Sequence, residues 1–155
     1  CLQQMVEAYA DIGGCMVAAM EVAPQKTASY GIVDIAEDRG ALVRAAGLVE
    51  KPKPQDAPSN LAVIGRYILT PKVMTNLNRM KQGAGGEIQL TDAIAEEVGG
   101  KEGVHALRFR GQRYDCGSKI GFLQATVAFG LSRPDLGKEF EAFLHAYFAM
   151  QKAAQ

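Results

Sequence analysis

Apolar residues recur with a helical period at both ends of the chain. Near the start, the spacing i, i+3, i+4, i+7 predicts an amphipathic helix over residues 2–11. Near the end, the same period predicts two helices, over residues 118–132 and 137–151, with Ser118 as an N-cap and Pro134 as the break between them. The three apolar stripes consist of Leu2, Met5, Val6 and Tyr9, of Phe122, Leu123, Val127 and Leu131, and of Phe140, Phe143, Leu144, Tyr147 and Phe148.

Between these helices the pattern is typical of strands. Short apolar runs bounded by turn residues predict buried strands over residues 15–22, 61–69 and 104–110. Two further β-rich runs, 30–35 and 42–49, flank a cluster of polar turn residues, and together they predict a hairpin.

Helical segments separate the later strands. Thr70 as N-cap and Pro71 at the first helical position predict a helix to about Met80. A glycine-rich loop over residues 81–87 follows, and Thr91 is the predicted N-cap of one more short helix. Because strands and helices alternate, the predicted fold class is α/β, with a mixed sheet, helices on its faces and helices at the C-terminal end.

Composition and charge exclude several classes of protein. In 155 residues, 17 Lys and Arg balance 17 Asp and Glu, so no global field attracts nucleic acid or an anionic membrane. The longest apolar runs fall well short of the roughly 18 residues that a membrane-spanning helix needs. The three cysteines are sparse and form no CxxC pair, which disfavours zinc and predicts a reducing, cytoplasmic location.

Two segments place candidate chemistry at strand ends. Gly31 opens a strand, where a glycine either lets a ligand approach the backbone closely or simply starts the strand. Glu50 and Lys51 end a strand before a proline turn. A carboxylate can accept hydrogen bonds from hydroxyl groups and an ammonium can hold a phosphate, although such a pair also occurs as a solvated pair beside a turn.

Two other segments leave similar alternatives. Residues 85–92 (GGEIQLTD) lead from a glycine-rich loop into a helix, either as a lid or as a simple helix entry. Asp115 follows a strand and precedes a helix, where it is either a metal ligand or a helix cap. Its neighbour Cys116 is not expected to be a nucleophile, because no histidine lies near it in sequence.

Between residues 30 and 137 the chain contains, in order, the strings YGIVD, GLVEKPKP, SNLAVIGRYIL, GAGGEIQLTDAI and RYDCGSKIGFLQATVAFGLSRPDLG, and the resemblance that they support covers about residues 2–145. In that combination the chain resembles the bacterial UTP–glucose-1-phosphate uridylyltransferases (UDP-glucose pyrophosphorylases). The EKP string also occurs in related sugar nucleotidyltransferases. The longer strings favour the uridylyltransferase branch over the thymidylyl- and guanylyltransferases.

The resemblance implies a Rossmann-like nucleotide-diphospho-sugar transferase fold that is incomplete in this chain. Residues 1–155 would be the C-terminal portion of a single domain, with a sugar-binding part at about 15–117 and a helical part at about 118–151. The implied reaction forms UDP-glucose and pyrophosphate from UTP and glucose 1-phosphate by in-line attack, with Mg²⁺ as cofactor.

Each motif residue has a role that the resemblance implies. Gly31 would contact the glucose through its backbone, and Glu50 would accept hydrogen bonds from the glucose hydroxyls. Lys51 would hold the sugar-side phosphate and act as the catalytic residue. Asp115 would be one of two carboxylates that bind Mg²⁺. The residues expected to line the sugar pocket are Ala62, Val63, Gly65 and Tyr67.

The sequence also departs from the family. A GxGTRxLPxTK-like loop, the uridine-contacting segment and the first metal-binding aspartate are absent, so the chain by itself is expected to be inactive. Strands that normally cover its sheet are expected to be absent too, which predicts exposed edges and a homo-oligomer, a rearranged sheet or a swapped dimer. The alternatives are a thymidylyl- or guanylyltransferase relative, or a non-catalytic fragment that binds sugar nucleotides or serves assembly.

Overall fold

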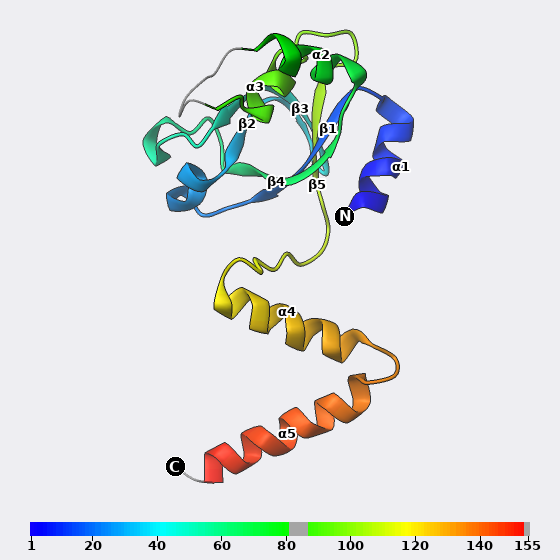
Figure 1. Ribbon diagram of the computed structural model, residues 1–155, viewed down its shortest axis with the longest axis vertical. Coiled ribbons are helices and arrows are strands. Elements are labelled where there is room, and N and C mark those ends of the chain that lie inside the picture. The colour runs from blue at the N-terminus through cyan, green and yellow to red at the C-terminus, as the bar shows by residue number, and fades with distance from the viewer. Residues whose placement is uncertain (81–86, 154–155) are drawn as a thin grey trace. The chain divides into compact units, whose positions relative to one another are not determined.

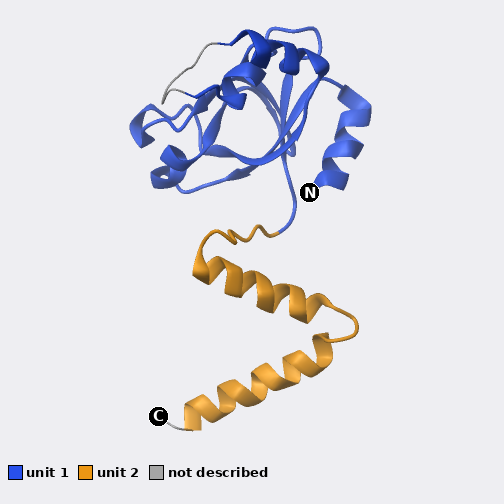
Figure 2. Cartoon of the chain, in the orientation of Figure 1, with its two compact units in different colours: residues 1–111 blue, residues 112–155 orange. Residues whose placement is uncertain are grey.

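The computed structural model describes residues 1–80 and 87–153, so the predicted glycine-rich loop lies outside the described residues apart from Glu87. The chain divides into two compact units, residues 1–111 and residues 112–155 (Figure 2). The first unit holds the sheet and three α-helices, and the second is a pair of helices (Figure 1).

The first unit begins with a helix and then alternates strands with helical turns. In chain order its elements are α1 (Leu2–Ile12), β1 (Cys15–Glu21), the 3₁₀ helix η1 (Pro24–Ser29), β2 (Gly31–Arg39), β3 (Leu42–Glu50), the 3₁₀ helix η2 (Pro54–Asp56), β4 (Leu61–Ile68), α2 (Pro71–Arg79), α3 (Leu90–Ala95) and β5 (Val104–Arg108). Every predicted strand is present, and so is the helix predicted at the start of the chain.

The five strands form a mixed sheet, as predicted, in the order β1-β4-β2-β3-β5. Strands β1 and β5 are parallel, and the other neighbouring pairs are antiparallel. The predicted hairpin is β2–β3, but its strands run further than the sequence suggested. The turn between them consists of Gly40 and Ala41. Gly40 has a φ of +79°, which glycine adopts without a steric cost.

The prediction of exposed sheet edges is wrong for the described residues. Strand β5 pairs with β1 on one side and with the start of β3 on the other, so the strand order closes into a ring. Register shifts in β2 between Asp34 and Ile35, and between Ile35 and Glu37, are the local cause. Bulges of this kind bend a strand and increase its twist, which carries the far end of the hairpin round to β5.

The two faces of the sheet pack into separate apolar clusters. In β1, Cys15, Val17 and Ala19 belong to one cluster, whereas Met16 and Ala18 belong to the other, as the alternation of side chains along a strand requires. The larger cluster takes residues from all five strands and from α2 and α3, and it therefore fills the ring. The smaller cluster packs under α1, which lies beside the ring in Figure 1.

The second unit consists of α4 (Lys119–Ser132) and α5 (Gly137–Ala153). Both helices were predicted, and so was the cap: Ser118 Oγ accepts the N–H of Gly121 at 3.1 Å. Among the residues that the structure describes, none of the helices is long and apolar enough to span a membrane.

Two helix starts in the first unit show how tertiary contacts compete with capping. Thr70 is the N-cap of α2, as predicted, yet its hydroxyl does not cap the helix and instead lies 3.6 Å from Cys15 Sγ. Helix α3 begins at Leu90 with Gln89 as its N-cap, so the prediction that Thr91 caps it is wrong. The hydroxyl of Thr91 instead donates a hydrogen bond to Glu50 on β3.

Candidate functional site

The end of the β2–β3 hairpin opposite its turn brings together several predicted site residues. Gly31 and Glu50 are directly paired across the two strands. Oxygen Oε2 of Glu50 accepts a hydrogen bond from Thr91 Oγ1 at 2.6 Å. The other oxygen, Oε1, lies 3.6 Å from Lys51 Nζ. The carboxylate is thus held from two sides while its side chain keeps 23% of its surface exposed, so a ligand can reach it.

A glycine at position 31 is required by close approach. A Cβ atom there would lie 3.1 Å from Glu50 Oε2 and 3.4 Å from both Thr91 Oγ1 and Thr91 Cγ2. The first of these distances is tighter than ordinary van der Waals contact, so a larger residue would push the carboxylate aside. The glycine therefore leaves room for the Glu50–Thr91 hydrogen bond.

Lys51 has an unusual backbone conformation. Its φ is +46°, a value that is uncommon for residues other than glycine. Residues with such backbone angles are found preferentially at functional sites. The N–H of Lys51 donates to the carbonyl of Tyr30 at 3.0 Å, so the hairpin pairing holds the backbone there. The Lys51 side chain is 61% exposed, and its ammonium lies next to the Glu50 carboxylate.

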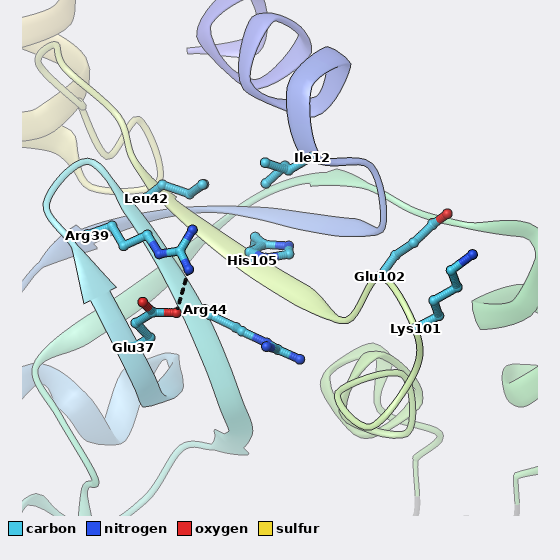
Figure 3. Close-up of a pocket in the computed structure, with 8 residues that line it drawn as sticks. All are labelled: Ile12, Glu37, Arg39, Leu42, Arg44, Lys101, Glu102 and His105. Carbon is cyan, nitrogen blue, oxygen red and sulfur yellow. Dashed lines mark hydrogen bonds and ion pairs between the residues drawn. The ribbon is translucent and has the colours of Figure 1, made fainter.

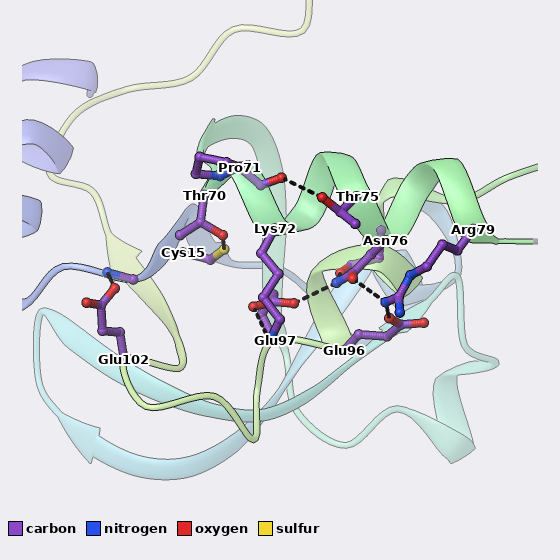
Figure 4. A network of polar contacts seen from close by, with 12 residues as sticks. Cys15, Thr70, Pro71, Lys72, Thr75, Asn76, Arg79, Glu96, Glu97 and Glu102 are labelled. Atoms are coloured by element: carbon purple, nitrogen blue, oxygen red, sulfur yellow. Dashed lines mark hydrogen bonds and ion pairs between the residues drawn. The ribbon is translucent and has the colours of Figure 1, made fainter.

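Thr91 was not recognised as a site residue in the sequence. It lies on α3, far from Glu50 along the chain, and the local sequence signals only a helix start. A network of polar side chains holds α3 against α2 (Figure 4). In it the buried Asn76 Nδ2 donates to Ala93 O at 3.2 Å and to Glu97 Oε1 at 2.6 Å, and Lys72 Nζ lies 3.2 Å from Glu97 Oε2.

The residues predicted to line a pocket all lie on β4 but differ in environment. Ala62 and Val63 are buried in the sheet, Val63 within the larger apolar cluster. Gly65 has a φ of +74° and faces open space. Tyr67 is half-buried, and burial, followed by the charge of Glu50, raises the pKa of its hydroxyl. Tyr67 is therefore electrostatically coupled to the Glu50 carboxylate.

Asp115 belongs to the second unit and is exposed. Its Oδ1 accepts the N–H of Gly117 at 3.1 Å, and its carbonyl accepts the hydroxyl of Ser118. The carboxylate thus organises the turn before α4 and does not cap the helix, which Ser118 does. No group of three or more His, Cys, Asp or Glu side chains that could hold a metal ion occurs within the described part of the chain.

The chemistry of this arrangement suits a phosphorylated, hydroxyl-rich ligand. A carboxylate with an exposed edge accepts hydrogen bonds from hydroxyl groups, and the adjacent exposed ammonium attracts a phosphate. This pair at a strand end of a mixed α/β fold defines a class of site with both an anion-attracting group and a hydrogen-bond acceptor.

Comparison with known proteins identifies the family to which the chain belongs. A family model described as "Nucleotidyl transferase" matches residues 1–130, and the chain belongs to that family. It is 52% identical over 120 residues to a UTP–glucose-1-phosphate uridylyltransferase of Komagataeibacter xylinus, an alignment that covers 77% of this chain and 42% of that protein.

Solved structures agree with the sequence comparison. A crystal structure of UDP-glucose pyrophosphorylase complexed with UDP-glucose matches with a TM-score of 0.77 and 41% identity, covering 85% of this chain and 50% of that one. A UTP-bound UGPase from Acinetobacter baumannii matches with a TM-score of 0.77 and 39% identity, covering 92% and 49%. The chain thus has part of a nucleotidyltransferase fold, as predicted, and spans about half the length of these relatives.

Proposed function

We propose that this chain forms the sugar-binding part of a UTP–glucose-1-phosphate uridylyltransferase. The observation that carries the proposal is the Glu50 carboxylate, held by the Thr91 hydroxyl and next to the Lys51 ammonium, above a glycine that leaves space for it. The names of the relatives support the choice of UTP and glucose 1-phosphate as substrates and of UDP-glucose as product.

In this proposal Glu50 accepts hydrogen bonds from glucose hydroxyls. Its hydrogen bond from Thr91 fixes the rotation of the carboxylate, so that the lone pairs not used by Thr91 face the ligand. Lys51 holds the phosphate that joins the sugar, because a flexible ammonium suits a point contact with phosphate. Gly31 offers its backbone to the sugar. The pocket wall comes from β4, through Ala62, Val63, Gly65 and Tyr67.

The reaction is a nucleotidyl transfer. A phosphate oxygen of glucose 1-phosphate attacks the α-phosphorus of UTP, and a new P–O bond forms. The bond from the α-phosphorus to the oxygen that bridges to the β-phosphorus breaks, and pyrophosphate leaves with that oxygen. The protein contributes positioning and charge neutralisation, and Lys51 neutralises charge on the attacking phosphate.

Asp115 is the residue of this chain that we assign to Mg²⁺. Its exposed carboxylate is the oxygen ligand that this ion takes, and Mg²⁺ is commonly bound through one or two carboxylates together with substrate phosphates. When bound, the ion neutralises phosphate charge. Only one carboxylate of these 155 residues, Asp115, is assigned to Mg²⁺, and the residues contain no GxGTRxLPxTK-like loop. By themselves they are therefore expected to bind sugar nucleotide without turning it over.

Calorimetric titration of the chain with UDP-glucose, with and without Mg²⁺, tests this function. We expect binding that Glu50→Gln weakens at least tenfold, because the amide retains the shape of the side chain but loses its charge. Glu7→Gln, a change at an exposed carboxylate on α1, is the matched control and is expected to leave binding unchanged.

Two outcomes would contradict the assignment. Equal binding by the wild type and Glu50→Gln would remove Glu50 from the sugar site. A wild-type chain that is folded by circular dichroism and yet binds no UDP-glucose would show that these residues do not form a sugar site. Tighter binding of a thymidine or guanosine diphosphate sugar would favour the related transferases.

We also propose a cytoplasmic location and a homo-oligomer. The free thiols of Cys1, Cys15 and Cys116 agree with a reducing compartment. The α4–α5 hairpin leaves many of its apolar side chains exposed, among them Phe122 and Phe143. An apolar surface of this kind is typical of a contact site between protein surfaces.

A further inference from the structure

A cavity lies at the turn end of the β2–β3 hairpin, away from Glu50 and Lys51 (Figure 3). It has a volume of about 260 Å³ and lies among β2, β3, β5 and the loop before β5. Side chains from four segments of the chain meet there, and Figure 3 shows Arg39, Arg44 and His105 among those that line it. The residues that line it are Ile12, Glu37, Arg39, Leu42, Arg44, Lys101, Glu102 and His105.

The charges of this cavity favour an anion. Three cationic side chains outnumber two carboxylates, and both carboxylates already have partners. Glu37 Oε2 accepts from Arg39 at 2.9 Å, and Glu102 Oε2 accepts the N–H of Gly14 at 3.1 Å. Arg44 has no hydrogen bond or ion pair with another described residue, and its charge acts on Glu37 only from a distance, so its donors can bind a ligand.

His105 provides a second, independent observation. Its Nδ1 is buried and has no hydrogen-bond partner among the described residues, although a buried polar atom normally has one. Burial, then the charges of Arg44 and Arg39, lower the pKa of this imidazole. An anion in the cavity would offset the charges of the two arginines beside the ring.

The cavity is distinct from the candidate sugar site. Arg44 and Glu50 lie on the same strand, six residues apart, which corresponds to roughly 20 Å at the rise of an extended chain. The lining of the cavity contains none of the residues assigned to the sugar. A ligand bound here would therefore not be the one held by Glu50 and Lys51.

We propose that this cavity binds the phosphate group of a small phosphorylated molecule. Phosphate suits the forked donors of Arg44 and Arg39. The cavity volume of about 260 Å³ is several times the roughly 30 Å³ that one water molecule occupies in the liquid, which leaves room for an organic group beside the phosphate. Ile12 and Leu42 offer an apolar wall to the organic part of the ligand.

Nuclear magnetic resonance of the full chain tests the proposal, because the two histidines give separate signals. Inorganic phosphate and phenyl phosphate are titrated at constant ionic strength, which chloride maintains. We expect saturable shifts at His105 and Arg44 and a rise in the pKa of the His105 imidazole, with His145 on α5 unchanged. Tighter binding of phenyl phosphate identifies an organic phosphate as the ligand, and equal binding identifies the inorganic ion.

Arg44→Gln is expected to weaken binding of both probes at least tenfold. Arg133→Gln, at an arginine paired with Asp135 in the second unit, is the matched control and is expected to have no effect. Glu50→Gln is expected to leave the His105 response intact, which separates this site from the proposed sugar site. The proposal is overturned if His105 shows no saturable response, or if Arg44→Gln binds phosphate as the wild type does.

Discussion

At the scale of single residues, the candidate site depends on a hydrogen bond between distant parts of the chain. Thr91 donates to Glu50 at 2.6 Å, while Gly31 leaves the space that this contact needs. Hydrogen bonds to charged groups contribute about 1.5–3 kcal/mol. Thr91 therefore acts as a positioning residue that fixes the carboxylate without itself being assigned to the ligand.

Thr91→Val is expected to weaken UDP-glucose binding roughly tenfold, because 1.4 kcal/mol corresponds to a factor of ten. Valine keeps the shape of threonine and removes only the hydroxyl donor. Thr91→Ser should retain most of the affinity, which a purely steric role would not explain. Calorimetric titration measures the effect, and Thr75→Val on the exposed face of α2 is the control. Unchanged affinity in Thr91→Val would show that the carboxylate needs no such support.

At the scale of elements, the buried amide of Asn76 joins α2 to α3. It donates to Ala93 O and to Glu97 Oε1, and its own oxygen accepts from Arg79 Nη2 at 2.6 Å. Figure 4 shows these groups between the two helices. Because α3 carries Thr91, the same contacts position the hydroxyl that reaches Glu50.

Asn76→Leu is expected to lower the free energy of unfolding by about 2–4 kcal/mol, because the Ala93 carbonyl and Glu97 Oε1 lose their hydrogen bonds from the buried amide. Urea denaturation measures the change. Asn78→Leu on the exposed face of the same helix is the matched control and should change stability by about 0.5 kcal/mol or less. If both variants are equally stable, the amide is not what joins the helices.

At the scale of the whole molecule, closure of the ring depends on β5. Arg108, at the end of that strand, donates to both oxygens of Asp38 at 2.8 Å and to Gly40 O at 2.6 Å, and it reaches Glu21 on β1 at 3.2 Å. Its hydrogen bonds also lower the pKa of the Asp38 carboxyl. One side chain thus connects β1, β5 and the hairpin turn.

Arg108→Gln is expected to open this end of the ring and leave the Glu50 end closed. Amide hydrogen exchange should become faster at residues 42–44 and 105–107, whose strands pair there, and should stay slow at residues 31–33. Arg66→Gln, at an exposed arginine that donates to the carbonyl of the preceding residue, Gly65, is the control. Exchange that is unchanged, or that rises equally at both ends, would contradict a local role for Arg108.

Local sequence signals predicted the elements well, because they depend on neighbouring residues. Ser118 caps its helix as expected, and Pro71 starts another, since capping and proline geometry involve only a few consecutive residues. Thr91 carried a capping signal too, yet its hydroxyl bonds to Glu50. The competing acceptor lies on another strand, where no local pattern reveals it.

The sequence by itself determined the order of strands and helices, the hairpin, the Glu50–Lys51 pair and the family to which the chain belongs. These follow from periodicity, turn residues and motif strings, which are properties of contiguous sequence. Only the tertiary structure decided that the sheet closes into a ring, that Thr91 supports Glu50, and that Arg39, Arg44 and His105 share a cavity. Each of these depends on contacts between residues far apart in the chain, and such contacts exist only once the strands have paired.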